Sequence, residues 1–298
     1  MAQTGHATSA DPQDTAAATT TSDNSSREPV TIRSLARMAK RGEPFACLTC
    51  YDYTTAKWLD RAGVPVLLVG DTAAEMILGH PQTIHAPLDV LIALTAAVKR
   101  GAPNALVMGD MPFLSYHTSD ADALTNAGRF LTEGLADAVK LEVDSSFAPR
   151  IEQMARAGIP VVAHIGSKPQ QAKLQGGYRS AGRTSDEAKL LLRDARAMEE
   201  AGASMLLIEA TPDAVTELVV SHAGVPVIGC GAGAACHGQI VVLQDLLGLS
   251  DWQPSFATPA ANLGTSIQQA AEQWRSRVSR GDLGDNPYRM RDGENVNL

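Results

Sequence analysis

The sequence predicts an α/β protein in which eight parallel strands close into a (β/α)8, or TIM, barrel. Short aliphatic, β-branched runs alternate with stretches whose apolar residues recur at helical spacing, which is typical of parallel strands covered by helices. Eight such runs occur, and eight strands favour a closed barrel, although an open doubly wound sheet remains an alternative. The length of 298 residues also suits this fold.

The predicted elements follow one another along most of the chain. Residues 1–28 have few large apolar side chains, so we expect a disordered tail, and residues 29–298 are expected to form a single barrel domain. A helix is predicted from Thr31 to Gly42, before the barrel, and an amphipathic helix at 262–280, after it. The predicted strands are 46–51, 64–71, 105–112, 138–143, 160–166, 204–210, 225–233 and 239–245. The predicted helices between them include 88–100, 120–135, 147–158, 185–201 and 213–222.

Composition excludes several classes of partner. The formal net charge is −8 and the pI about 5.4, which argues against nucleic acid or an anionic membrane as the main partner, since both require a basic face. The chain contains no run of roughly 20 apolar residues that could span a bilayer. The N-terminus lacks the features of a signal peptide, so we expect a cytoplasmic protein.

The four cysteines fit a reducing compartment. Cys47 and Cys50 form a C-x-x-C pair, but they lie in a predicted strand, where positions i and i+3 point to opposite faces. The other two, Cys230 and Cys236, do not complete a zinc-binding pattern. We therefore expect buried, reduced thiols rather than a metal or redox site.

Charged residues gather at the ends of the predicted strands. In barrels of this class the carboxyl ends of the strands form the mouth that carries the reacting groups. The side chains at or near these ends are Asp71, Asp110, Lys140, Glu142, His164 and Glu209. Several carboxylates at one mouth would repel one another unless a cation balances them, and oxygen ligands suit Mg²⁺. The sequence therefore predicts a divalent-metal site.

Simpler interpretations of these residues also remain open. A single aspartate after a strand, such as Asp71 or Asp110, is often the N-cap of the next helix. Lys140 and Glu142 face the same side of one strand and could form a plain ion pair. His164 could be a core histidine without a role in chemistry. The glycine-rich segment GCGAGAACHG at 229–238 could be an anion-binding loop or a tight turn before the eighth strand, and it does not match the P-loop pattern.

The chain resembles the ketopantoate hydroxymethyltransferase family from about Thr31 to about Arg280. The resemblance is carried by short motifs in a specific order: LTCYD at 48–52, VGD at 69–71, GH at 79–80, AVKRGAPN at 97–104, DMPF at 110–113, KLE at 140–142, AHIG at 163–166, GGY at 176–178, GR at 182–183, IE at 208–209, VPVIGCGAG at 225–233, GQ at 238–239 and DLLG at 245–248.

The resemblance implies an activity, cofactors and an assembly. The implied reaction moves a one-carbon unit from 5,10-methylenetetrahydrofolate to the enolate of 3-methyl-2-oxobutanoate, giving 2-dehydropantoate for pantothenate synthesis. One Mg²⁺ per subunit and a homodecamer are implied as well. By match to the motifs, Asp71, Asp110 and Glu142 would bind the metal, and Glu209 would be the general base. The oxo acid would contact Asp71, Thr72, Asp110 and Lys140.

The sequence departs from the family pattern at several positions. Thr72 stands in place of a serine, which keeps the hydroxyl. The other departures are Val143 and Asp144 after KLE, Ser167 in IGSKPQ, His237 in the CHGQ stretch and Gln244 before Asp245. None of these is an implied metal ligand or base, so they bear on the folate pocket rather than on enolate formation.

Three other functions compete with this interpretation. One is a metal-dependent 2-oxo acid lyase or hydrolase of the phosphoenolpyruvate mutase and isocitrate lyase type, although its K-K-C-G-H-like cysteine motif is not found here. Another is a class I aldolase in which Lys140 forms a Schiff base. The third is a non-catalytic paralog that serves as a binding protein.

Overall fold

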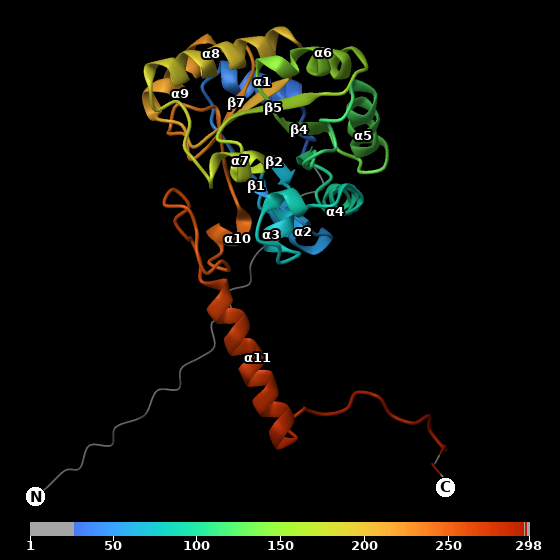
Figure 1. The fold of residues 1–298 in the computed structure, drawn as a ribbon. Helices are drawn as coiled ribbons and strands as arrows, with labels where there is room; N and C mark the ends of the chain where they lie inside the picture. The colour runs from blue at the N-terminus through green and yellow to red at the C-terminus, as the bar shows by residue number, and fades with distance from the viewer. Residues whose placement is uncertain (1–26, 295, 297–298) are drawn as a thin grey trace, which may run out of the picture.

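The computed structural model describes residues 27–294 and 296, and these form the predicted barrel (Figure 1). The eight strands pair in chain order, all in parallel, and β8 closes onto β1. They are β1 (Phe45–Thr49), β2 (Val66–Val69), β3 (Leu106–Asp110), β4 (Ala138–Glu142), β5 (Val161–Gly166), β6 (Met205–Glu209), β7 (Val227–Cys230) and β8 (Gly238–Val241). The predicted fold class is confirmed and the open sheet is excluded; residues 1–26 of the predicted disordered tail lie outside the described part of the chain.

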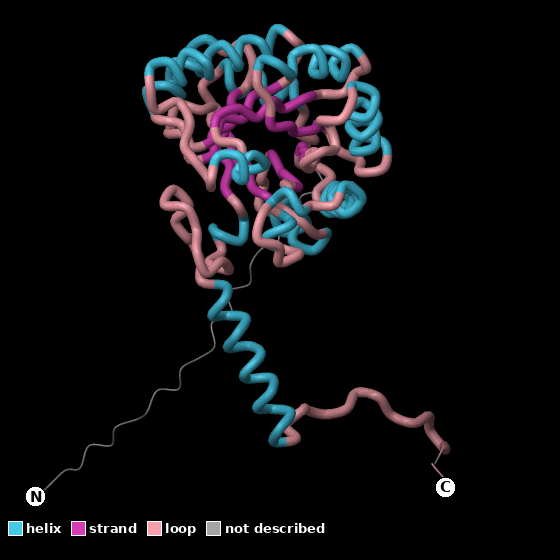
Figure 2. Tube along the Cα trace, in the orientation of Figure 1, coloured by secondary structure: helices cyan, strands magenta, loops and turns pink. Residues whose placement is uncertain are grey.

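Helices surround the strands as an outer ring (Figure 2). They are α1 (Ile32–Lys40), α2 (Tyr53–Arg61), α3 (Ala73–Met76), α4 (Leu88–Gly101), α5 (Asp120–Thr132), α6 (Ala148–Arg156), α7 (Ala172–Gln175), α8 (Ser185–Glu200), α9 (Asp213–His222), α10 (Leu243–Leu246) and α11 (Leu263–Arg280). Side-chain caps define several starts: the Asp52 carboxylate accepts the Thr55 N–H at 2.8 Å, and Thr184 and Glu187 form a capping box. None of the described helices has the length and apolar character that a membrane-spanning helix needs.

The hydrophobic core has two layers, separated by the strands. The inner layer fills the barrel and includes Phe45, Cys47 and Leu68, and Leu35 of α1 packs into it. The outer layer lies between the strands and the helices and contains Cys50. Cys47 and Cys50 therefore point to opposite faces, as predicted, and all four cysteines are free.

The ring of helices is incomplete on one side. The outward-facing residues of β2 to β6 are buried, whereas Ala46 of β1 and Gln239 of β8 are exposed, and Leu48 and Val241 are only partly buried. No long helix follows β7, and the long helix after β8, α11, projects away from the barrel (Figures 1 and 2). None of the residues of α11 is buried.

Candidate active site

A cavity of about 380 Å³ opens at the carboxyl ends of the strands. It is lined by every side chain that the sequence places at this edge, namely Asp71, Thr72, Asp110, Lys140, Glu142, His164 and Glu209. Parallel strands direct their carboxyl ends to one mouth, so residues far apart in the sequence come together there. The predicted convergence of these groups is confirmed.

Asp110 and Lys140 form the most tightly bonded pair in the cavity. They are register partners on β3 and β4, and Lys140 Nζ lies 2.7 Å from each carboxylate oxygen of Asp110. The Asp71 N–H also donates to Asp110 Oδ2, at 2.9 Å. Asp110 is therefore not a helix cap, and Lys140 bonds across to the neighbouring strand rather than to Glu142.

Gln170, which follows β5, connects the remaining two carboxylates. Its Nε2 donates to Asp71 Oδ2 at 2.8 Å and to the Met111 carbonyl at 3.1 Å. Its backbone N–H lies 3.1 Å from Glu142 Oε2, and its Oε1 accepts the Tyr116 hydroxyl at 2.8 Å. The side-chain amide of Gln170 therefore fixes the carboxylate of Asp71, and its backbone N–H fixes that of Glu142.

Burial and neighbouring charges shift the pKa values of the acids in the cavity. Burial raises the pKa of Asp110 to about 7; Lys140 opposes this rise and Asp71 adds to it. Burial and then Asp71 also raise the pKa of Glu142, although Lys140 lowers it. Burial disfavours the charged form of Lys140, but the carboxylates of Asp110 and Asp71 outweigh burial and raise its pKa. Burial thus favours the protonated forms of Asp110 and Glu142, whereas the neighbouring carboxylates favour the charged form of Lys140.

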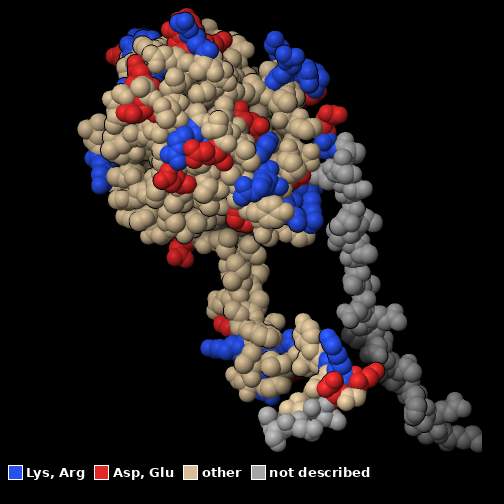
Figure 3. Space-filling model, turned by 90° about the vertical axis from the view of Figure 1, so that its right-hand side faces the viewer, with Lys and Arg blue, Asp and Glu red and all other residues tan. Residues whose placement is uncertain are grey.

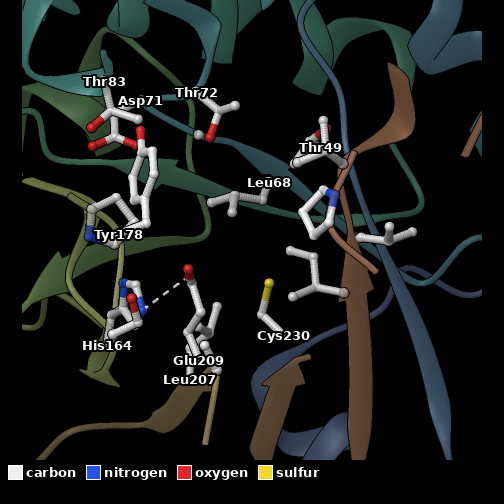
Figure 4. A pocket seen from close by; sticks show the side chains of 18 of the residues that line it. Thr49, Leu68, Asp71, Thr72, Thr83, His164, Tyr178, Leu207, Glu209 and Cys230 are labelled. Atoms are coloured by element: carbon white, nitrogen blue, oxygen red, sulfur yellow. Dashed lines mark ion pairs between the residues drawn. The ribbon is translucent and has the colours of Figure 1, made fainter. Parts of the chain in front are cut away.

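Glu209 faces this cluster from β6 (Figure 4). Its side chain is 23% exposed, and its Oε2 lies 3.4 Å from Nε2 of the fully buried His164. The other ring nitrogen of His164 lies 3.9 Å from Glu142 Oε1, and neither nitrogen has a hydrogen-bond partner among the described residues. Burial lowers the pKa of His164, which favours the neutral ring. Gly166 lets the two strands approach, because a Cβ there would lie 2.5 Å from the Glu209 carbonyl oxygen.

The rim of the cavity is made of loops. The hydroxyl of Tyr178, in the loop after α7, donates to Glu75 Oε1 of α3 at 3.0 Å, so a hydrogen bond links the two sides of the mouth. Thr72 lines the cavity next to Asp71, and its side chain does not cap α3. Trp252 and Phe256, from the segment between α10 and α11, also line the cavity.

The donor set suits a hard divalent cation. Among the residues that the structure describes, no three His, Cys, Asp or Glu side chains are grouped so as to hold an ion by themselves. Mg²⁺ does not require such a group, because it is usually held by one or two carboxylates together with water and substrate oxygens. Burial raises the pKa values of Asp110 and Glu142, and a divalent cation bound beside them would offset that effect by favouring their charged forms.

The structure also decides between several of the simpler interpretations. The carboxylates of Asp71 and Asp110 bond within the cavity and do not cap helices. The glycine-rich segment connects β7 to β8, and its anion-binding interpretation stays a prediction. A Schiff-base role for Lys140 is disfavoured, because its raised pKa keeps the amine protonated and non-nucleophilic.

Sequence reasoning missed three residues of this site. Gln170 lies in the IGSKPQ segment, which departs from the family pattern, and the sequence predicts no role for Tyr116 or Tyr178. The GGY motif at 176–178 is the sequence signal that includes Tyr178. The contacts of Gln170 and Tyr116 depend on loops that meet only in the folded barrel.

Comparison with known proteins identifies the family. Solved structures of similar fold include phosphonopyruvate hydrolase, with a TM-score of 0.57 at 14% identity over 85% of this chain and 88% of that chain. Another is 2,3-dimethylmalate lyase, with a TM-score of 0.55 at 18% identity over 87% of this chain and 90% of that chain. At these identities the likeness shows the fold alone.

The sequence relatives are much closer. The 3-methyl-2-oxobutanoate hydroxymethyltransferase of Hyperthermus butylicus is 45% identical over 86% of this chain and 88% of its own length. The enzyme of that name from Enterococcus faecalis is 44% identical, over 81% of this chain and 88% of its own length. The family model for ketopantoate hydroxymethyltransferase matches residues 29–286, and the chain therefore belongs to this family.

Proposed function

We propose that this cavity transfers a one-carbon unit from 5,10-methylenetetrahydrofolate to 3-methyl-2-oxobutanoate and yields 2-dehydropantoate, in pantothenate biosynthesis. The observation that carries the proposal is the position of Glu209, a partly exposed carboxylate that faces a buried, charged cluster across one small cavity. Membership of the family, with curated relatives at about 45% identity, supports the same reaction.

The charged cluster provides the binding half of the site. Asp71, Asp110 and Glu142 would hold Mg²⁺, and Asp71, Thr72, Asp110 and Lys140 would contact the oxo acid. When bound, the metal supplies Lewis acidity to the keto oxygen of the substrate. The ammonium of Lys140, held by Asp110, adds positive charge where the carboxylate or the developing enolate oxygen lies.

Glu209 would be the general base of the reaction. It removes the proton on C3 of the oxo acid, and the electron pair of that C–H bond moves into the enolate. Nε2 of His164 lies 3.4 Å from this carboxylate, and burial lowers the pKa of the ring, so the ring favours its neutral form and does not compensate the charge of the base. C3 then forms a bond to the methylene carbon of the folate, whose two carbon–nitrogen bonds break. Water supplies the hydroxyl group of the product, and its second proton and the proton taken from C3 pass to the two folate nitrogens. The hydrogen bond between Tyr178 and Glu75 limits access of solvent during enolate formation.

The assembly and location are proposed on separate grounds. We propose a homodecamer, because the chain resembles a family in which this assembly is common. A cytoplasmic location is supported by the four free cysteines, which fit a reducing compartment.

Proton NMR in D₂O tests the reaction in its two halves. With the protein and Mg²⁺, the C3 proton signal of 3-methyl-2-oxobutanoate should disappear, and a chelator should stop the loss. 2-Dehydropantoate should form only when methylenetetrahydrofolate is added. Exchange without product would point to a different one-carbon donor, and the absence of exchange under every condition would refute the proposed function.

The variant Glu209→Gln tests the base. It should still bind Mg²⁺ and the oxo acid but lose C3 proton exchange, because an amide cannot accept the proton. Asp245→Asn is the matched control, since Asp245 lines the same cavity but is proposed neither to take a proton nor to close the mouth. Normal exchange in Glu209→Gln would remove this residue as the base.

A further inference from the structure

The short loop after β5 carries Gln170, which holds two carboxylates of the cavity. The side chain of Gln170 donates to Asp71 Oδ2 at 2.8 Å, and its backbone N–H lies 3.1 Å from Glu142 Oε2. Ser167 and Pro169, from the same loop, line the cavity. The position of this loop therefore decides how the carboxylates of Asp71 and Glu142 are arranged.

Lys168 begins the turn that contains Gln170. A single 3-10 turn spans Pro169–Gln171, and the Gln171 N–H closes it by donating to the Lys168 carbonyl at 2.9 Å. The side chain of Lys168 does not cap this turn. It extends instead to the segment after β4, where its Nζ lies 2.9 Å from Asp144 Oδ2. An ion pair with Asp144 thus anchors the residue from which the turn starts.

This ion pair lies next to the contact between Gln170 and Glu142. Asp144 follows Glu142 by two residues, on the segment that leaves β4. Lys168 precedes Gln170 by two residues, on the loop that leaves β5. The loop therefore runs back along the segment after β4, and Gly166 allows the reversal with a φ of 96°. The ion pair is the outer of two successive contacts, and it holds the inner one in register.

The Lys168–Asp144 pair differs from the pairs on the open surface. Basic and acidic side chains lie next to one another at several places on the barrel surface (Figure 3), and exposed pairs of this kind contribute little. The side chain of Lys168 is only 12% exposed and that of Asp144 35%. The carboxylate of Asp144 is also held by the Ser146 N–H, which donates to it at 3.0 Å. The acceptor is therefore fixed before the lysine reaches it.

We propose that Lys168 and Asp144 are positioning residues for the metal site. Their ion pair holds the turn of Gln170 against the end of β4, and this turn sets the carboxylates of Asp71 and Glu142 for a divalent cation. The inference rests on the metal site of the proposed function and extends it to two residues that contact neither metal nor substrate. Both lie in segments that depart from the family pattern, so the resemblance to the family does not imply the pair.

The variant Lys168→Met separates positioning from a simple charge effect. It removes a positive charge near the site, and by Coulomb attraction alone this would strengthen the binding of a cation. Positioning has the opposite sign, because the carboxylates lose their alignment. We expect the affinity for Mn²⁺ to fall about 3- to 10-fold, less than the 10- to 100-fold typical of losing a group bonded directly to a metal ligand. Titration of the metal-free, full-length protein with Mn²⁺, followed by electron paramagnetic resonance without substrate, measures this affinity.

Rescue and control variants sharpen this test. Lys168→Arg keeps the charge, so its Mn²⁺ affinity should stay within about twofold of the wild type. Asp144→Asn combined with Lys168→Met should bind Mn²⁺ no more weakly than Lys168→Met alone, because the pair is already broken. Lys99→Met is the matched control. Lys99 pairs with Asp137 at 2.6 Å with similar exposed fractions, 21% and 34%, but at the amino end of β4, so its loss should leave the Mn²⁺ affinity unchanged.

Two further measurements follow the loop and the chemistry separately. In metal-free Lys168→Met, amide hydrogen exchange at Gln170 and Gln171 should be faster than in the wild type, and it should be unchanged in Lys99→Met. At saturating Mg²⁺ and oxo acid, kcat of Lys168→Met should stay within about twofold of the wild type, while the Mg²⁺ concentration needed for half-maximal rate rises. Such a split is expected because the variant weakens metal binding and leaves Glu209 in place.

Each contrary result has a distinct meaning. Equal or tighter Mn²⁺ binding by Lys168→Met would overturn the inference and leave the proposed function intact. Equal losses of affinity in Lys168→Met and Lys99→Met would also overturn it, because the effect would then reflect general stability. Unchanged exchange at Gln170 and Gln171 would show that the ion pair does not hold the turn. A wild-type protein that binds no Mn²⁺ would refute the proposed metal site itself, and the inference with it.

Discussion

Lys140 Nζ lies 2.7 Å from both carboxylate oxygens of Asp110, and both side chains are almost completely buried. The pair joins adjacent strands at the floor of the cavity. Removing one member of a buried ion pair leaves the other as an uncompensated charge, which costs far more than losing an exposed pair. The ion pair therefore links the stability of the barrel to the charge balance of the site.

Lys140→Met should lower the free energy of unfolding by about 3–5 kcal/mol, because it leaves Asp110 buried without its partner. Asp110→Asn combined with Lys140→Met should recover part of this loss, since neither charge then remains. Urea unfolding of the two single variants and the double variant measures the coupling. Lys189→Met is the control: its pair with Asp186 is exposed and should contribute less than about 1 kcal/mol. Equal losses at Lys140 and Lys189 would contradict the prediction.

The position of the charged residues could be predicted because it follows from the strand pattern. Parallel strands share one carboxyl edge, so Asp71, Asp110 and Glu209 had to meet once the barrel was recognised. Which oxygen bonds to which donor could not be predicted in the same way. Lys140 pairs with Asp110 on the neighbouring strand, because the register sets these two residues side by side.

Sequence patterns could not predict the contacts that loops make. Gln170 bonds to Asp71, 99 positions away in the chain, and to Tyr116, 54 positions away. No periodicity encodes such pairs, since they form only when the loops fold over the mouth. The amphipathic pattern at 262–280 likewise predicted a helix, but not that α11 would leave its own barrel.

Gln170→Ala should lower the free energy of unfolding strongly. The truncation removes the donor to Asp71 and the acceptor of the Tyr116 hydroxyl, and each buried group left without a partner costs about 1–3 kcal/mol. The neighbouring Gln171→Ala, whose side chain is only partly buried, should change the unfolding free energy by less than about 0.5 kcal/mol. Denaturant unfolding of the two variants compares them directly, and similar values would argue against a structural role for the Gln170 amide.

Tyr178→Phe should weaken closure of the mouth. The hydroxyl of Tyr178 stays protonated at neutral pH because burial and then Glu75 raise its pKa, so it remains a donor to Glu75. Loss of a hydrogen bond worth about 0.5–1.5 kcal/mol corresponds to a rise in the KM for the oxo acid of about 2- to 10-fold. Amide hydrogen exchange at 176–182 should also become faster. Tyr288→Phe, in the exposed C-terminal segment, should change neither measurement, and an unchanged KM in Tyr178→Phe would exclude the closing role.

His237 should make the protein less stable in mild acid. Its Nδ1 accepts the Val227 N–H at 3.0 Å, which requires an unprotonated nitrogen, and burial lowers the pKa of the ring. The unfolded chain, with an ordinary histidine pKa of about 6.5, therefore takes up a proton at a higher pH than the folded chain does. Stability contributed by the neutral ring is present above pH 6.5 and falls as the pH drops toward the lower pKa of the folded state. His237→Gln keeps an acceptor at this position but cannot be protonated, so its unfolding free energy should depend less on pH between about 7 and 5 than that of the wild type. Denaturation curves across this range measure the difference, and identical pH profiles would show that His237 does not contribute to it.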